Sequence, residues 1–182
     1  MEKVIFGIVG ETGAGKNSLA RKVSDENGIV VSYTTRPSRE GEIEGREHFF
    51  ISDKEYDELQ RTSHVVAPCN TGKYRYCATV ESIVDGSLYL IEPSGVQWFK
   101  DNKVEGLRMV TIGIHVSLEE RRARCKDRSD YSTAFDKRVA DEQMVFANYR
   151  LNGNFDYMIT NHDLDKASKV LAFIMRAELD RE

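Results

Sequence analysis

The chain has 182 residues, with 26 lysines and arginines against 30 aspartates and glutamates, and a formal net charge of −4 at pH 7. This length suffices for one core with a small inserted lobe, but two independent domains would be cramped. The acidic balance gives no overall basic field that would favour nucleic acid as a partner. Because no apolar run approaches the length of a membrane span and the first residues lack a signal-peptide pattern, we expect a cytoplasmic protein without a membrane partner.

The cysteines and histidines give no sign of a metal centre. Cys69, Cys77 and Cys125 form no CxxC pair, which favours reduced thiols in the packing over a disulfide framework or a zinc site. The four histidines are scattered, and none stands at metal-ligand spacing from a cysteine or carboxylate. We therefore expect no metal held by the protein alone.

Short apolar runs alternate with helical patterns along the chain. Strands are expected at residues 4–9, 29–33, 88–91, 110–116 and 157–160. Helices are expected from near Asn17, over residues 53–61, from near Ser117, and up to about Tyr149. This alternation predicts a three-layer α/β/α fold with a five-stranded parallel sheet, in which ligands bind beyond the carboxyl ends of the strands.

A glycine-rich loop follows the first predicted strand. The stretch "GETGAGKN" has the GxxxxGK spacing of a phosphate-binding loop, and its backbone N–H groups and the following helix would attract an anion. The alternative is a merely tight turn, which the full motif between strand and helix disfavours. We expect a P-loop NTPase-type fold, with ATP bound by Gly10, Thr12, Gly13, Ala14, Gly15, Lys16, Asn17 and Ser18.

One letter of this motif is unusual. Asn17 stands where a serine or threonine normally offers a hydroxyl to magnesium. The amide oxygen of Asn17 can approach a hard cation, so weakened metal support is expected, with Mg²⁺ bound together with ATP. Ser18 points about 100° further around the helix and does not substitute for that hydroxyl.

Two segments interrupt the regular alternation. Residues 35–78 contain two of the three prolines, several glycines and short strands around one helix, which predicts a lobe inserted between core segments 1–34 and 79–182. Residues 124–133 are polar and rich in arginine, a composition typical of a mobile lid. We expect this lid to extend over about 124–137.

The stretch "SYTTRPSREGEIEGREHFF", together with the phosphate loop and the terminal "TNHDLDKA", resembles the guanylate kinase family of nucleoside monophosphate kinases over nearly the whole chain. The resemblance implies transfer of the γ-phosphate of ATP to GMP, dGMP or a related nucleotide. Guanidinium forks suit this task because they offer paired donors to phosphate oxygens. By the resemblance, the acceptor is bound by Ser32, Arg36, Arg39, His48, Tyr76 and Glu92.

The resemblance also assigns roles to the predicted lid. Lys16, Arg124, Arg128 and Arg138 would be the catalytic residues that offset charge on the moving phosphoryl group. Arg121 and Arg122 are interpreted instead as a solvated helix face or as partners of Glu119 and Glu120. Asn161 is similar to a family residue near the donor adenine, although an ordinary cap or turn residue is the alternative.

The match fails where the family reads guanine. The family's base-reading carboxylate falls at Ala67, a hydroxyl falls at Ala78, and the first of two paired acids falls at Leu90. Residues 62–80 contain neither Asp nor Glu, although Asn70 or His64 would be available to read a different base edge. Glu92 retains the second acid and would contact the base or the water shell of the metal, or pair with a neighbouring cation as a strand-end carboxylate. Because matched hydrogen-bond partners carry base discrimination, the acceptor base stays open.

Two other functions remain as alternatives. Kinases of phosphorylated ribose have loops that tolerate a residue without a hydroxyl after the lysine, as at Asn17. A non-catalytic guanylate-kinase-like module would use the lobe to hold a phosphorylated partner, but such domains typically lack the loop and the lid arginines that are present here. The sequence predicts no oligomeric state.

Overall fold

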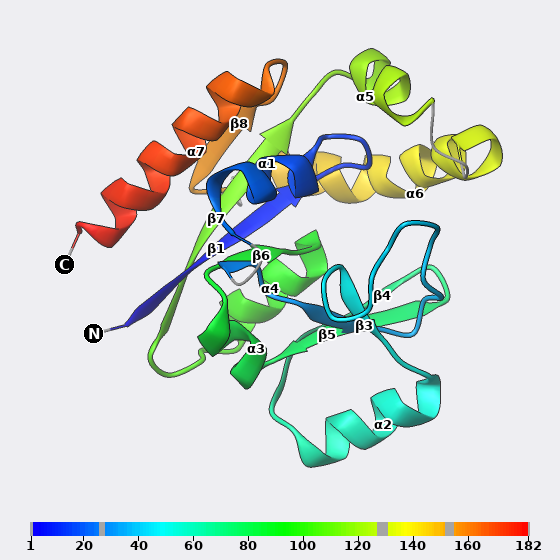
Figure 1. The fold of residues 1–182 in the computed structure, drawn as a ribbon, viewed down its shortest axis with the longest axis vertical. Coiled ribbons are helices and arrows are strands. Elements are labelled where there is room, and N and C mark those ends of the chain that lie inside the picture. The colour runs from blue at the N-terminus through cyan, green and yellow to red at the C-terminus, as the bar shows by residue number, and fades with distance from the viewer. Residues whose placement is uncertain (1, 26–27, 127–130, 152–154, 182) are drawn as a thin grey trace.

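A computed structural model describes residues 2–25, 28–126, 131–151 and 155–181. Its first sheet has four parallel strands in the order β6-β1-β7-β8 (Figure 1). These strands are β1 (Lys3–Gly10), β6 (Leu88–Leu90), β7 (Leu107–His115) and β8 (Tyr157–Thr160). Four of the five predicted strands therefore lie where the apolar runs indicate.

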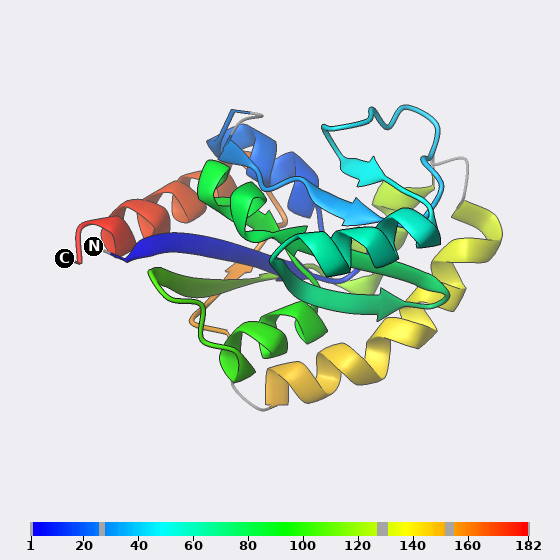
Figure 2. The ribbon, with the colours of Figure 1, turned by 90° about the horizontal axis from the view of Figure 1, so that it is seen from below.

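Helices cover both faces of this sheet, because successive side chains of a strand point to opposite faces. In β1, Val4, Phe6 and Ile8 pack with residues of α1 (Lys16–Val23) and α7 (Leu164–Leu179). The alternate residues Ile5 and Val9 pack with α3 (Val80–Asp85), α4 (Pro93–Asp101) and α6 (Tyr131–Leu151). Figure 2 shows α1 and α7 on one side of the sheet and α4 and α6 on the other. The predicted three-layer α/β/α class is confirmed.

The prediction that residues 29–33 form a fifth strand of this sheet is wrong. Ile29 forms only an isolated parallel bridge with Leu88, next to the Val30 backbone N–H, which donates to the Leu88 carbonyl at 2.8 Å. The chain then enters a second sheet as β2 (Ser32–Thr34). The aliphatic run is too short to continue, and from Ser32 onward buried and partly exposed side chains alternate, which suits a half-buried strand.

The second sheet forms a lobe beside the first. It has the order β3-β2-β5-β4, with β3 (His48–Phe50), β4 (Val65–Thr71) and β5 (Tyr74–Thr79), and it contains both parallel and antiparallel pairs. The predicted helix is α2 (Asp53–Thr62), which begins at a capping box made by Ser52 and Glu55. A mixed lobe with one helix, as the irregular composition indicates, is therefore present.

The polar segment that follows α5 (Leu118–Cys125) is helical at both ends. The Ser117 hydroxyl caps α5 by accepting from the Glu120 N–H at 3.2 Å, and α6 begins at Tyr131. The irregular segment predicted at residues 124–133 is therefore too long, since residues 124–125 and 131–133 are helical. Its polar, arginine-rich composition reflects exposure to solvent and not the absence of a helix. Residues 127–130 lie outside the described ranges. None of the helices in the described ranges is both long and apolar enough to span a bilayer.

Candidate active site

The glycine-rich loop joins the end of β1 to the start of α1. Gly13 and Gly15 have φ angles of 83° and 86°, which favour glycine because a Cβ is strained there. Gly15 also needs the space, since a Cβ would lie 2.7 Å from Nδ2 of Asn161. The strand, loop and helix of a phosphate-binding motif are thus in the expected sequence, close to the end of β8.

The first turn of α1 presents positive charge. It contains no acidic residue, so nothing in that turn offsets the positive end of the helix dipole. The Lys16 ammonium donates to the Gly10 carbonyl and therefore lies folded over the loop. Asn17 and Ser18 are exposed on this turn. The arrangement can bind an anion through backbone N–H groups and one ammonium.

Asn161 and Arg124 line the back of the loop. Asn161 is buried, and its Nδ2 donates to the Ala14 carbonyl at 2.8 Å. Its Oδ1 is buried without a hydrogen-bond partner in the described part of the chain. Arg124 Nη2 donates to the Asn161 carbonyl at 2.5 Å. Because Asp163 is the residue that caps α7, the alternative of an ordinary cap does not apply to Asn161.

The prediction of a solvated face for Arg121 is wrong. Arg121 is 4% exposed, and its guanidinium donates to Glu11 Oε1 at 3.1 Å and to the Thr12 carbonyl at 3.2 Å. The physical reason is that Glu11 lies in the buried part of the loop and needs a counter-charge. Arg122 is exposed as predicted, but it pairs with Asp136 at 2.7 Å and not with a neighbouring glutamate.

Glu142 of α6 is a contact of the loop that the sequence analysis missed. Its carboxylate accepts from the Thr12 N–H at 2.8 Å and from the Thr12 hydroxyl at 2.5 Å. The sequence pattern that could have indicated Glu142 is its helical spacing from the apolar residues Phe135, Phe146 and Tyr149, which are all buried. Arg138, a predicted lid residue, is partly buried on the same helix, whereas Arg128 lies outside the described residues.

The lobe holds a second cluster of charged side chains. Arg36 is buried, and its fork donates to both carboxylate oxygens of Glu42 at 2.9 and 3.0 Å. Burial opposes the charged form, but these bonds and the charge of Glu42 outweigh it and raise the pKa of Arg36. The Arg39 backbone N–H donates to the same carboxylate at 2.7 Å. Glu42 therefore fixes Arg36 in one orientation beside Arg39.

Three further predicted acceptor residues surround this fork. Ser32 Oγ lies 2.9 Å from Nδ1 of His48, and the His48 ring stands edge-on to Tyr76 with centroids 5.9 Å apart. Burial and then the positive charge of Arg36 lower the pKa of His48 to about 4. Ser32, Arg36, His48 and Tyr76 are thus brought together, with His48 neutral near pH 7.

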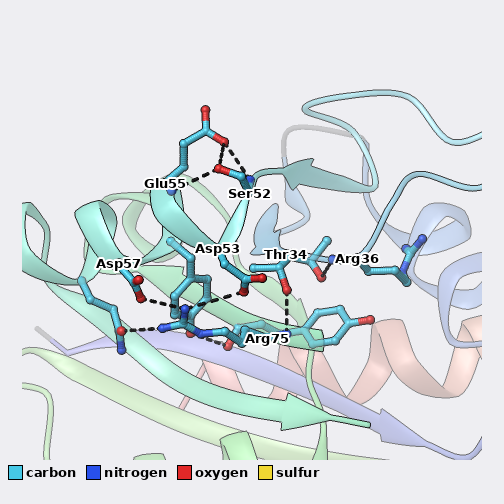
Figure 3. Close-up of polar contacts among 11 residues, drawn as sticks. Thr34, Arg36, Ser52, Asp53, Glu55, Asp57 and Arg75 are labelled. Carbon is cyan, nitrogen blue, oxygen red and sulfur yellow. Dashed lines mark hydrogen bonds and ion pairs between the residues drawn. The ribbon is translucent and has the colours of Figure 1, made fainter. Parts of the chain in front are cut away.

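The rest of the lobe supports this cluster. Figure 3 shows the Thr34 hydroxyl accepting from the Arg36 backbone N–H, at 3.1 Å. Arg75 of β5 ties α2 to the sheet through Asp57 at 2.7 Å, and its guanidinium lies 3.9 Å from the ring centroid of Tyr56 (Figure 3). A rigid frame of this kind keeps the arginine fork in place.

Glu92 lies between the loop and the lobe. It follows β6, whose neighbour β1 leads into the loop. Burial raises the pKa of Glu92, while the nearby Lys16 ammonium acts in the opposite direction. Burial and then the charge of Glu92 raise the pKa of Cys69 in β4 to about 11. An ion pair between Arg21 of α1 and Glu47 of the lobe also joins the two parts.

The two alanines in the base-reading positions face the core. Ala67 is 1% exposed, has a φ of 49° beside an irregularity in the pairing of β4 with β5, and packs in one cluster with Ile91 and Val96. Ala78 is fully buried in the same cluster. His64, one of the two polar residues available to read a different base edge, is exposed and lies near Glu81. Within residues 62–80, the charge of Glu92 acts on the pKa of Cys69.

Metal ligation by protein groups alone finds no support within the described ranges, where no group of three or more His, Cys, Asp or Glu lies close enough together to hold a metal ion. Oxygen donors near Lys16 are nevertheless present, in the Asn17 amide at the start of α1 and in the Glu92 carboxylate.

Comparison with protein families gives a match over nearly the whole chain. The family model described as guanylate kinase matches residues 2–178. A guanylate kinase from Dechloromonas aromatica is 30% identical over 184 residues, which cover 95% of this chain and 88% of that protein. One from Wolbachia pipientis is 26% identical over 186 residues, which cover 97% and 91%.

Comparison with solved structures supports the fold. The crystal structure of guanylate kinase from Anaplasma phagocytophilum superimposes with a TM-score of 0.70 at 24% sequence identity. The match covers 97% of this chain and 86% of that chain. Both sheets of the present structure therefore belong to a fold that is already known.

Proposed function

This chain belongs to the guanylate kinase family, and on that premise we propose that it is an ATP-dependent kinase that phosphorylates GMP, dGMP or a related nucleoside monophosphate. The observation that carries the proposal is a pair of cationic groups on adjoining parts of the molecule, the Lys16 ammonium over the loop and the Arg36 fork in the lobe. An ion pair of Arg21 with Glu47 joins the two parts. Two substrates bound at the loop and at the lobe would meet between these parts, phosphate against phosphate.

The donor site is formed by the loop and by Asn161. The N–H groups from Gly10 to Ser18 and the Lys16 ammonium would bind the phosphates of ATP. A buried acceptor without a partner is costly, and the exocyclic amino group of adenine would supply the missing donor to Oδ1 of Asn161. Arg124, held against the Asn161 carbonyl, would border the same pocket.

The acceptor site is formed by the lobe. Arg36 and Arg39 would bind the phosphate of the monophosphate through guanidinium N–H groups. Glu42 accepts from the Arg36 fork and from the Arg39 backbone N–H, and it thereby orients both residues. Ser32, His48 and Tyr76 would add hydrogen bonds around it. Ala67 and Ala78 are buried in the core and present no polar group to a base, so Glu92 would be the carboxylate that contacts it.

Phosphoryl transfer needs positioning and charge neutralisation. An oxygen of the acceptor phosphate attacks the γ-phosphorus of ATP, the bond from that phosphorus to the bridging oxygen breaks, and ADP leaves with the electron pair. The attacking oxygen is already anionic, so no general base is required. Lys16, Arg124, Arg128 and Arg138 would offset the charge that develops, and closure of the lobe and of the predicted lid over the two substrates would exclude water.

The residues present fit a magnesium ion that arrives with ATP. Mg²⁺ prefers oxygen ligands, keeps several waters and binds mainly through substrate phosphates. The Asn17 amide oxygen and the Glu92 carboxylate would face such an ion or its water shell. When bound, Mg²⁺ would neutralise charge on the β- and γ-phosphates.

We also propose a cytoplasmic location and substrates limited to small nucleotides. Cys69, Cys77 and Cys125 are free thiols, which fits a reducing compartment. The net charge of −4 gives no general attraction to nucleic acid.

An acceptor screen tests the proposal. ADP formation from ATP and Mg²⁺ is measured with GMP, dGMP, the other nucleoside monophosphates and ribose 1,5-bisphosphate. Turnover of at least one nucleoside monophosphate is expected. Turnover of ribose bisphosphate alone would favour the other kinase, and inactivity with every acceptor, without thermal stabilisation by ATP, would favour a binding module.

A further inference from the structure

We propose that Glu142 is a positioning residue of the phosphotransfer reaction. By holding Thr12 of the phosphate loop, Glu142 fixes the place at which Arg138 of the same helix meets the phosphates of ATP. The inference rests on the proposed kinase function and adds to it a residue that acts through others, without touching the reacting atoms.

The contact between Glu142 and the loop is specific. The two carboxylate oxygens accept from two different groups of Thr12, the backbone N–H at 2.8 Å and the hydroxyl at 2.5 Å. Hydrogen bonds to a charged acceptor are roughly twice as strong as those between neutral groups. Glu142 therefore restrains both the backbone and the side chain of one loop residue.

The pattern of α6 indicates why a carboxylate stands at this position. Phe135, Phe146 and Tyr149 are buried along one stripe of the helix, and Arg138 and Glu142 lie on the same stripe at intervals of three and four residues. Glu142 is only 22% exposed at its side chain. A carboxylate on an apolar stripe is unfavourable unless it is paired, and Thr12 provides the partner.

The helix on the other side of the predicted lid holds the same end of the loop. Arg121 of α5 donates to Glu11 and to the Thr12 carbonyl, and its Nη1 lies 4.0 Å from Oε2 of Glu142. Arg121 of α5 and Glu142 of α6 thus contact the same two loop residues, Glu11 and Thr12, and both helices are held against this end of the loop.

Arg138 is one helical turn from the anchor. Four residues of α-helix rise about 6 Å, so a fixed Glu142 fixes the start of the Arg138 side chain relative to the loop. Without the anchor, α6 shifts or rotates against the loop. A displacement of about 1 Å at a reacting group is enough to cost on the order of 100-fold in rate.

The test compares four variants: Glu142→Ala, Glu142→Gln, Arg138→Ala, and the double variant with Glu142→Ala and Arg138→Ala. For each, kcat, the KM for the best acceptor from the screen, and Tm are measured. Glu142→Ala should lower kcat about 10- to 100-fold with little change in acceptor KM. Glu142→Gln should stay within about threefold, because an amide can accept from the Thr12 N–H and donate to its hydroxyl. Asp141→Ala, one residue earlier and exposed, is the matched control and should stay within about twofold.

The double variant separates positioning from mere stability. If Glu142 acts through Arg138, combining Glu142→Ala with Arg138→Ala should cost much less than the product of the single losses. Independent losses, or a Gln variant as slow as the Ala variant, would overturn the proposal. Should Glu142→Ala fail to fold, Thr12→Val removes one of the two bonds and should lower kcat about fivefold; an unchanged kcat would contradict the anchor. Wild-type inactivity with every acceptor would overturn the proposed function as well, whereas an active wild type with an equally active Glu142→Ala would overturn this inference alone.

Discussion

Two buried arginines of this protein are paired with carboxylates in the absence of substrate. Arg36 is held by Glu42 and Arg121 by Glu11, in both cases with the guanidinium largely buried. Removing one partner of such a pair is costly because it leaves the other charge desolvated and unpaired. The Glu42 pair also holds the planar Arg36 fork in one orientation, so little side-chain entropy would be lost if a phosphate bound there, as proposed.

Replacing Arg36 by alanine tests the assignment of the lobe. Arg36→Ala should raise the KM for the acceptor about 10- to 100-fold, because hydrogen bonds to charged groups are each worth about 1.5–3 kcal/mol. ATP affinity, measured by calorimetry without acceptor, should change by less than about threefold, since the loop is a separate site. Arg61→Ala, an exposed arginine of the same lobe, serves as the control. Equal losses for both ligands would contradict the separate roles.

His48 should make stability depend on pH. Its pKa is lowered from an ordinary value of 6.5 to about 4, chiefly by burial, so between these values the unfolded chain binds more protons than the folded one. The free energy of unfolding should therefore be unaffected by His48 above pH 6.5 and fall as pH decreases from 6.5 to 4, by at most about 3 kcal/mol. Urea unfolding at pH 7, 5.5 and 4.5 should show that the free energy of unfolding depends less on pH for His48→Tyr than for the wild type. The same pH dependence in both proteins would refute the role assigned to His48.

At the scale of elements, sequence patterns located most of the fold because the relevant information is local. Strand β8 lies at the predicted residues 157–160, and the predicted helix at 53–61 is α2, one residue longer. The sheet to which residues 29–33 belong was mispredicted, because the choice between two sheets depends on partners such as β5 that lie far along the chain. Glu142 was missed for a related reason: its partner, Thr12, is 130 residues away, and helical periodicity does not report which loop a charged residue meets.

The turn between β1 and α1 gives a prediction at this scale. Gly15→Ala should destabilise the fold by more than about 1–2 kcal/mol, the cost of a Cβ in the left-handed region, because that Cβ would also collide with Asn161. It should also reduce ATP affinity strongly. Gly106→Ala is the matched control, since Gly106 has a φ of 75° and nothing within 4 Å of the added Cβ. Chemical unfolding of both variants measures the difference, and equal destabilisation would mean that Asn161 yields.

At the scale of the whole molecule, the two sheets share an apolar cluster, in which Ala67 of the lobe packs with Ile91. The helix that follows the loop, α1, is also joined to the lobe by the ion pair of Arg21 with Glu47. Parallel sheets bind ligands beyond the carboxyl ends of their strands, which is where the loop lies. In the proposed function, the lobe would therefore add a second anion site at the edge of the sheet where the loop would provide the first.

One molecule that carries both nucleosides tests this geometry directly. Adenosine and the nucleoside of the best acceptor from the screen, joined 5′ to 5′ by a single phosphate chain, would occupy both sites at once if the two anions lie end to end. Linking two ligands in this way can raise affinity about 100-fold or more over either part, provided that the chain spans the sites. Calorimetry should therefore give a Kd at least about 100-fold below that of ATP for the wild type, and Arg36→Ala should remove most of that advantage while leaving ATP binding intact. If the linked compound binds no more tightly than ATP, the loop and the lobe do not form one continuous site.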